Sequence, residues 1–326
     1  MRTRVVLLAV VVSVAGMAGA AGEAQQAPTS PRRSSVSTRT DQAFRTPWGD
    51  PDLQGIWDYS SPTPMERPAA LANKAFLTEE EAAALDRQGA EQAARARAEA
   101  GREAWWEAKG TRPGGRRTSL VTTPDGKIPS LTPEAKKSLS EQAALIQAPP
   151  GGPEDRSVTE RCIKGFNSGP PMDPHNYNNL IQIFQAPGQV AILNENIHKA
   201  RIVPLDGRPH TGIHQWAGDP RGRWEGNTLV VDTTNFRGPT SFKDSGPNLH
   251  LIERFTRVDR DTLRYEFTVD DPTTWTRPWS AEIPMTRTNN PIYEFACHEG
   301  NSSMVGMLAG SRADERAAKA KDPSPR

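Results

Sequence analysis

Residues 249–270 read LHLIERFTRVDRDTLRYEFTVD, and this stretch decides the fold. Apolar and polar residues alternate along 262–270, and 249–258 is equally rich in β-branched and aromatic side chains. A period of two is typical of strands, whereas helices repeat every 3.6 residues. The connection Asp259-Arg260-Asp261 is short and polar, as in a hairpin turn. These residues therefore predict two adjacent antiparallel strands.

Further short strands are predicted on both sides of this hairpin, and most of them follow one another through hairpin turns. They are expected at 180–185, 189–194, 199–205, 224–226, 228–235, 279–288 and 291–297. Near-regular spacing of such strands is typical of an up-and-down barrel. We therefore expect a mainly β domain over residues 154–310. It would be a lipocalin-like up-and-down β-barrel or a strongly curved antiparallel sheet, with a two-sheet sandwich as the alternative.

Residues 46–153 form an extended and helical segment that we expect to pack on the β domain. Its first part, 46–70, is rich in proline and turn residues, and should wrap over a preformed core. Thr78 followed by acidic residues predicts the start of one helix. Thr132 and Pro133 predict the N-cap and first residue of a second helix. Residues 311–326 are a polar tail, expected to be helical or disordered.

The start of the chain has the features of a secretory signal peptide. Arg2 and Arg4 precede a short apolar run, and Ala18-Gly19-Ala20 fits the cleavage pattern. We expect a signal peptide at 1–20 and a disordered linker at 21–45, and hence a periplasmic or secreted protein. No later run approaches the ~20 apolar residues of a membrane helix, so no integral membrane segment is expected after cleavage.

The sequence contains two cysteines, Cys162 and Cys297, near the two ends of the predicted β domain. In an oxidising compartment two such cysteines most simply form one disulfide. A reactive thiol beside His298 is the alternative. Adjacent residues on a strand point to opposite faces, which disfavours a Cys297–His298 catalytic pair.

Charge and motifs exclude several classes of function. The chain has 40 basic and 39 acidic residues, so it offers no overall field to attract nucleic acid. It has no G-x-S-x-G, dinucleotide-binding or phosphate-loop fingerprint, and we expect no cofactor. The spacings Glu195-x-x-His198 and His210-x-x-x-His214 would share a face only on a helix, which is not expected there. No metal site is therefore predicted.

Several longer motifs carry a resemblance. Residues 205–210 read LDGRPH, 216–231 read WAGDPRGRWEGNTLVV, and 296–301 read ACHEGN; 249–255 and 271–279 add LHLIERF and DPTTWTRPW. Over about 46–310 the chain resembles an uncharacterised family of exported bacterial proteins. The family usually has Ser in place of Pro220 and Asp in place of Asn227. The resemblance implies export and common descent, but no activity and no functional residue.

Candidate site residues come from the polar and aromatic groups of the β half, which contains all six histidines. Histidine is the usual general base near neutral pH. As a catalytic group we expect His210, His250 and Glu253, with Arg254 steadying an anion. Polar groups on strands can line a cavity inside the barrel or pair structurally, and tryptophans beside arginines can stack a flat ligand. The expected ligand-binding residues are Glu195, His198, Arg208, Trp216, Trp224 and Asp232.

Three functions follow from these features. The first is an exported β-barrel protein that binds a small, partly polar ligand in its interior. The second is a cofactor-independent acid–base enzyme, such as a lyase, hydratase or hydrolase, that uses histidine and glutamate in the same barrel. The third is a structural or interaction module with a solid core and an exposed aromatic patch. No oligomeric state is predicted.

Overall fold

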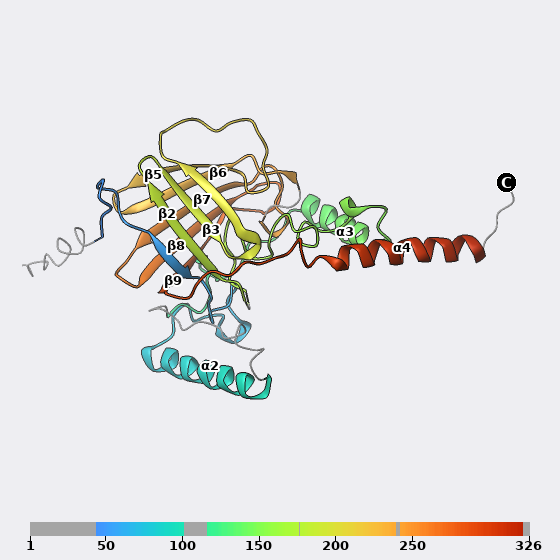
Figure 1. Cartoon of the computed structure of the whole chain (residues 1–326). Helices are drawn as coiled ribbons and strands as arrows, with labels where there is room; N and C mark the ends of the chain where they lie inside the picture. The colour runs from blue at the N-terminus through green and yellow to red at the C-terminus, as the bar shows by residue number, and fades with distance from the viewer. Residues whose placement is uncertain (1–43, 101–115, 176, 239–241, 322–326) are drawn as a thin grey trace, which may run out of the picture.

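A computed structural model describes residues 44–100, 116–175, 177–238 and 242–321. The expected signal peptide and nearly all of the expected linker lie outside these ranges. The described chain forms one nine-stranded antiparallel sheet that is nearly closed into a barrel (Figure 1). The strands are β1 (Gly55–Asp58), β2 (Leu180–Ala186), β3 (Gln189–Asn194), β4 (Lys199–Pro204), β5 (Asp219–Glu225), β6 (Thr228–Thr234), β7 (His250–Arg257), β8 (Thr262–Asp270) and β9 (Trp279–Thr288).

The predicted barrel is confirmed, because all strands belong to one continuous sheet with the order β4-β3-β2-β1-β9-β8-β7-β6-β5. The hairpin that decides the fold pairs β7 with β8 over its whole length, from His250 opposite Asp270 to Arg257 opposite Leu263. The alternation of β8 places Leu263, Tyr265, Phe267 and Val269 inside the barrel, where all four are buried. The sandwich alternative, which needs two sheets, does not occur.

The first strand comes from the segment that was expected to lie over the core. β1 pairs with β2 and with β9, so it lies in the middle of the sheet. Trp57, opposite Ile181, points inward and is fully buried. The strand has four residues and only one of them is buried, which is too short for an alternating pattern to be recognised.

The expected strand at 291–297 is wrong, and the position of β1 explains why. β9 already has β1 on one side and β8 on the other, so it leaves no edge for another strand. Residues 289–298 instead form irregular chain. The backbone N–H of Phe295 donates to Nε2 of His198 at 3.0 Å, and Cys297 forms a disulfide with Cys162 across a sequence separation of 135 residues. The predicted disulfide is therefore confirmed.

The two edge strands of the sheet, β4 and β5, approach each other closely at Gly222. Gly222 of β5 faces the interior at this seam. A Cβ atom on Gly222 would lie 2.5 Å from Cδ2 of Leu205 and 2.7 Å from Cγ1 of Val203. No side chain fits in this space, so glycine allows the two strands to come together.

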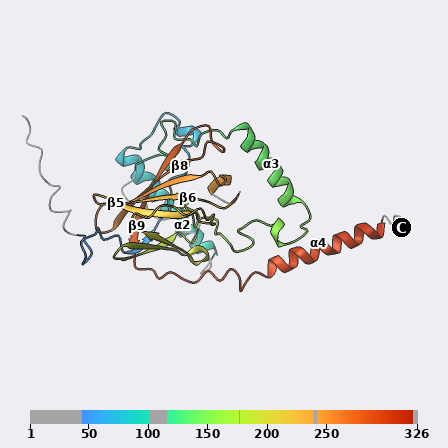
Figure 2. The same cartoon turned by 90° about the horizontal axis from the view of Figure 1, so that it is seen from above.

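In the described ranges, three α-helices lie outside the barrel: α2 (Glu79–Ala100), α3 (Pro133–Gln147) and α4 (Ser302–Lys321). The predicted starts of the first two are confirmed. Thr78 and Glu81 form a capping box, and Thr132 Oγ1 accepts from the N–H of Ala135 at 3.1 Å. Figures 1 and 2 show α2 beside the barrel wall, and α3 and α4 beyond one end of it. No helix in the part of the chain that the structure describes could cross a membrane.

Candidate functional site

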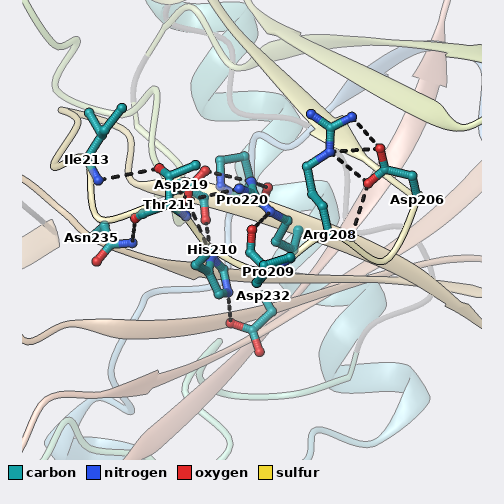
Figure 3. Close-up of polar contacts among 11 residues, drawn as sticks. Asp206, Arg208, Pro209, His210, Thr211, Ile213, Asp219, Pro220, Asp232 and Asn235 are labelled. Carbon is teal, nitrogen blue, oxygen red and sulfur yellow. Dashed lines mark hydrogen bonds and ion pairs between the residues drawn. The ribbon is translucent and has the colours of Figure 1, made fainter.

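Two features could carry a function: a histidine–aspartate cluster on the outer wall of the barrel and a pocket at one end of it. The cluster consists of Asp219 of β5, Asp232 of β6, His250 of β7 and His210 of the loop that follows β4. Figure 3 shows His210 between Asp219 and Asp232. Antiparallel pairing brings Asp232 of β6 opposite Ile252 of β7, on the outward face. His250 precedes Ile252 by two residues and therefore shares that face. The loop adds His210.

One carboxylate oxygen contacts both histidines. Oδ1 of Asp232 lies 3.0 Å from Nε2 of His250 and 3.3 Å from Nε2 of His210. On the far side of His210, Nδ1 lies 2.8 Å from the carbonyl oxygen of Asp219. A carbonyl only accepts, so Nδ1 of His210 carries a proton. Nε2 of His210 can then donate to Asp232 only when both of its ring nitrogens are protonated.

His250 is the more open of the two rings. Its side chain is 45% exposed, against 29% for His210. Nε2–H of His250 donates to Asp232, which leaves Nδ1 as the unprotonated nitrogen of the neutral ring. Within the residues that the structure defines, no group hydrogen-bonds this Nδ1. An imidazole that is oriented by a carboxylate and has a free nitrogen can act as a general base.

Asp219 fixes the loop that holds His210. Its Oδ2 accepts from the N–H of Thr211 at 2.6 Å, and its Oδ1 accepts from Arg221 at 2.6 Å. Burial disfavours the charged form of Asp219, but these hydrogen bonds outweigh it and lower the pKa of the carboxyl group. Asp219 is therefore a positioning group for His210.

The other expected catalytic residues lie apart from this cluster. Glu253 points into the barrel and is fully buried. It forms a two-pronged ion pair with Arg201 of β4, and the hydroxyl of Tyr265 donates to it at 2.8 Å. Arg254 lies on the outer wall and donates to Glu225 at 2.8 Å. Side chains alternate between the two faces of β7, so Glu253 points inward and His250 outward. The four expected catalytic residues therefore do not share one site.

The expected ligand-binding residues are also dispersed. Arg208 is on an exposed loop, where it pairs with Asp206. Trp224 faces the core. Glu195 and His198 lie beyond the end of β3, near the irregular chain around residues 293–295. Burial raises the pKa of Glu195. Only Trp216 reaches a large hollow, which is described next.

The second feature, here called the end pocket, lies at the barrel end where β5 begins and β6 ends. It has a volume of about 820 Å³ and lies between α3, residues 154–173 and the chain around residues 216, 237–238 and 242–243. Phe242 belongs both to this wall and to the core, where its ring packs 5.8 Å from that of Trp279 and 5.9 Å from that of Phe267. It therefore separates the end pocket from the barrel interior.

The end pocket combines apolar walls with charged groups. Its apolar and aromatic lining includes Leu145, Ile146, Val158, Phe166, Trp216 and Phe242. The guanidinium of Arg237 lies 4.9 Å from the ring centre of Trp216, which is a cation–π distance. Its charged lining consists of Arg156, Arg161, Lys164, Arg237, Lys243, Glu154, Asp155 and Asp173.

Lys164 has the most perturbed charge in the end pocket. Burial, and the nearby positive charges of Lys199 and Arg201, lower the pKa of its amine to about 8. A strongly shifted group in a hollow is a candidate for function. No periodic pattern or motif marks Lys164 in the sequence, because residues 154–173 are largely irregular. The signal available there was the density of Gly, Pro and basic residues.

The described part of the chain contains no group of three or more His, Cys, Asp or Glu side chains that could hold a metal ion. Comparison of the chain with protein-family models, with curated proteins and with solved structures finds no significant match. Function therefore has to be argued from the two features themselves.

Proposed function

We propose that this is a β-barrel protein that binds a small, partly polar organic ligand in the end pocket. The observation that carries the proposal is a single hollow of about 820 Å³ in which aromatic and aliphatic walls meet several cationic side chains. Sites for small molecules typically measure ~300–1,000 Å³ and combine an apolar lining with a few polar groups. The end pocket has both properties.

The sequence suggested a ligand site inside the barrel, whereas the proposed site is the end pocket outside it. Large side chains fill the barrel, among them the fully buried Trp57, Tyr265 and Phe267. Glu253, one of the polar groups that suggested an internal cavity, forms an ion pair with Arg201 there. The end pocket, in contrast, lies outside the core and is bordered by α3 and by loops. Loops that are held by a rigid scaffold commonly carry binding residues.

We also propose that the protein works outside the reducing cytoplasm, as a member of the exported family that its motifs resemble. The signal-peptide pattern at the N-terminus and the Cys162–Cys297 disulfide support this, because structural disulfides persist in oxidising compartments. Mass spectrometry of protein purified from the producing cell would test it. Mature chains should begin after Ala20; a cytoplasmic chain that retains Met1 to Ala20 would refute it.

Tryptophan fluorescence during titration with a panel of metabolites tests the binding proposal. A ligand of the end pocket should change the emission of Trp216, and Trp216→Ala should weaken its binding at least tenfold. Trp48→Ala is the matched control. Trp48 is 38% exposed near the opposite end of the barrel, where it donates to Asp50, so affinity should stay within twofold. A panel without any binder, or a ligand that tolerates both Trp216→Ala and Ile146→Asp, would refute the proposal.

A second candidate function, acid–base catalysis on the outer wall, is favoured by one observation. Asp232 orients His250 while Nδ1 of that ring meets no described protein group. A substrate panel for lyases, hydratases and hydrolases would test it. His250→Gln and Asp232→Asn should each lower kcat by 10²-fold or more if the pair supplies a general base. His214→Gln is the control, because His214 is bonded to the carbonyl of Phe236 in the same region. Equal turnover by all variants would exclude the site.

A further inference from the structure

The charges that line the end pocket do not balance. Five of the lining side chains are cations and three are carboxylates. Asp173 pairs with Lys243 at 2.9 Å, and Asp155 accepts from the backbone N–H groups of Gly151 and Gly152. Neither carboxylate contacts Arg161.

Arg161 is the clearest uncompensated charge. Its side chain is half-buried and lines the end pocket, yet it makes no hydrogen bond, ion pair or ring contact with any residue that the structure describes. The neighbouring Arg156 shows the usual alternative, since it pairs with Glu160 at 2.6 Å and donates to the carbonyl of Ile146. A half-buried guanidinium without a protein partner is suited to an external anion.

Lys164 adds to the same positive region from the barrel side. The positive charges of Lys199 and Arg201, both on β4, repel the charged form of Lys164 and lower its pKa. Arg201 is neutralised by Glu253, but Lys199 is itself partly desolvated, and its pKa is lowered by burial and by Arg201. An anion near Lys164 would relieve this accumulation of positive charge.

The apolar wall shows what else the ligand must carry. Leu145 and Ile146 of α3 line the end pocket and are 67% and 42% exposed. Trp216 and Phe242 line the same pocket. An inorganic anion would leave these surfaces in contact with water, whereas an apolar or aromatic body would cover them.

We propose that the end pocket selects organic carboxylates with an apolar or aromatic body, and that Arg161 and Lys164 bind the carboxylate. This inference rests on the proposed binding function and specifies its ligand class. Arg161 can offer two parallel N–H groups to a carboxylate, and Lys164 a compact ammonium group. The apolar body would lie along α3 and Trp216.

The test is calorimetric titration of the full protein with a library of small aryl and alkyl carboxylic acids, each measured beside its own primary amide. Acids should bind at least tenfold more tightly than their amides. Arg161→Gln and Lys164→Met should each reduce this preference to less than threefold while amide affinity changes by less than twofold. Arg208→Gln, on an exposed loop away from the end pocket, is the matched control and should keep the full preference.

Proton uptake gives a readout that a merely structural role would not produce. At pH 8.5 an anion bound at Lys164 should draw a proton onto its amine, so the measured enthalpy should differ between two buffers of different ionisation enthalpy that do not bind as anions of this class, EPPS and Tris. Lys164→Met should remove most of this difference, with any remainder due to Lys199.

The outcomes separate the two proposals. If acids and amides bind equally at the end pocket, the carboxylate inference fails and the binding function stands. If neither binds, both fail. If acids are preferred but Arg161→Gln and Lys164→Met keep the preference, the assignment of these residues is overturned. Inorganic phosphate alone should bind at least tenfold more weakly than the best acid; equal binding would refute the role of the apolar wall.

Discussion

Arg201 and Glu253 form an ion pair across the barrel interior, with Nη1 2.6 Å from Oε2 and Nη2 2.9 Å from Oε1. The two residues lie on β4 and β7, which are not neighbours in the sheet. Tyr265 donates to the same carboxylate at 2.8 Å and accepts from the N–H of Met172 at 3.2 Å. These three side chains thus form a buried polar network in which each member has a partner.

Breaking this network on one side should destabilise the protein strongly. Glu253→Gln leaves the guanidinium of Arg201 buried without a counter-charge. We expect the free energy of unfolding to fall by about 3–5 kcal/mol, measured by urea denaturation.

Replacing all three members by apolar residues is the matched control. Arg201→Met, Glu253→Leu and Tyr265→Phe together should restore most of the stability, because apolar groups of similar volume need no partners. A Glu253→Gln variant as stable as the wild type would contradict the placement of this ion pair in the core.

The seam between β4 and β5 should be sensitive to side-chain volume at Gly222. Gly222→Val would push atoms into Leu205 and Val203, where a Cβ atom alone comes within 2.7 Å. We expect a loss of about 1–3 kcal/mol, as in overpacked cores. Arg223→Val, on the adjacent outward-facing position of the same strand, should change stability by about 0.5 kcal/mol or less. Equal effects of the two substitutions would argue against a tight seam.

The disulfide should contribute substantially to stability because it closes a long loop. With 135 residues between Cys162 and Cys297, the chain-entropy model gives ~4–5 kcal/mol, and measured losses are commonly about 2–5 kcal/mol. The double variant Cys162→Ser, Cys297→Ser should unfold at lower urea concentration by this amount. A reducing agent should destabilise the wild type and leave the double variant unchanged; sensitivity of the double variant would show that the reagent acts elsewhere.

Lys164 should lower stability at neutral pH. Its pKa of about 8 lies below the ordinary value of 10.5. Between these two values the unfolded chain retains a proton that the folded protein has lost, so stability should rise with pH across that window. Below pH 8 the folded protein bears the full cost of the buried charge.

Lys164→Met should remove that cost. At pH 7 we expect the free energy of unfolding to increase by about 1–3 kcal/mol. The rise in stability between pH 8 and 10.5 should become smaller, with a remainder from Lys199, whose pKa is also lowered. Urea denaturation at pH 7, 8.5 and 10 checks both effects. A destabilised Lys164→Met protein at pH 7 would mean that the amine stabilises the fold instead.

The limits of the long strands β8 and β9 could be predicted from the sequence, whereas the four-residue strand β1 could not. Residues 262–270 and 279–288 alternate over enough positions that their expected limits match β8 and β9. β1 has one buried side chain, Trp57, and its place between β2 and β9 depends on the rest of the sheet. The strand expected at 291–297 failed for the same reason, since the edge it required is occupied.

The site residues divide in a similar way. Asp232 and His250 lie on neighbouring strands of the meander, so local pairing brings them together. The pairing of Glu253 with Arg201 depends on closure of the barrel, which no local pattern encodes. The end pocket is built from α3 and irregular chain far apart in sequence, and Arg161 and Lys164, which line it, follow no period.

Cys162 has a further consequence, because it lies in the segment that forms one wall of the end pocket. The partner cysteine anchors that wall to the chain leaving β9. A newly made chain that still has thiols would hold the wall through non-covalent contacts alone. The barrel strands pair without this bridge, so reduction of the disulfide should loosen the wall of the end pocket and leave the sheet intact.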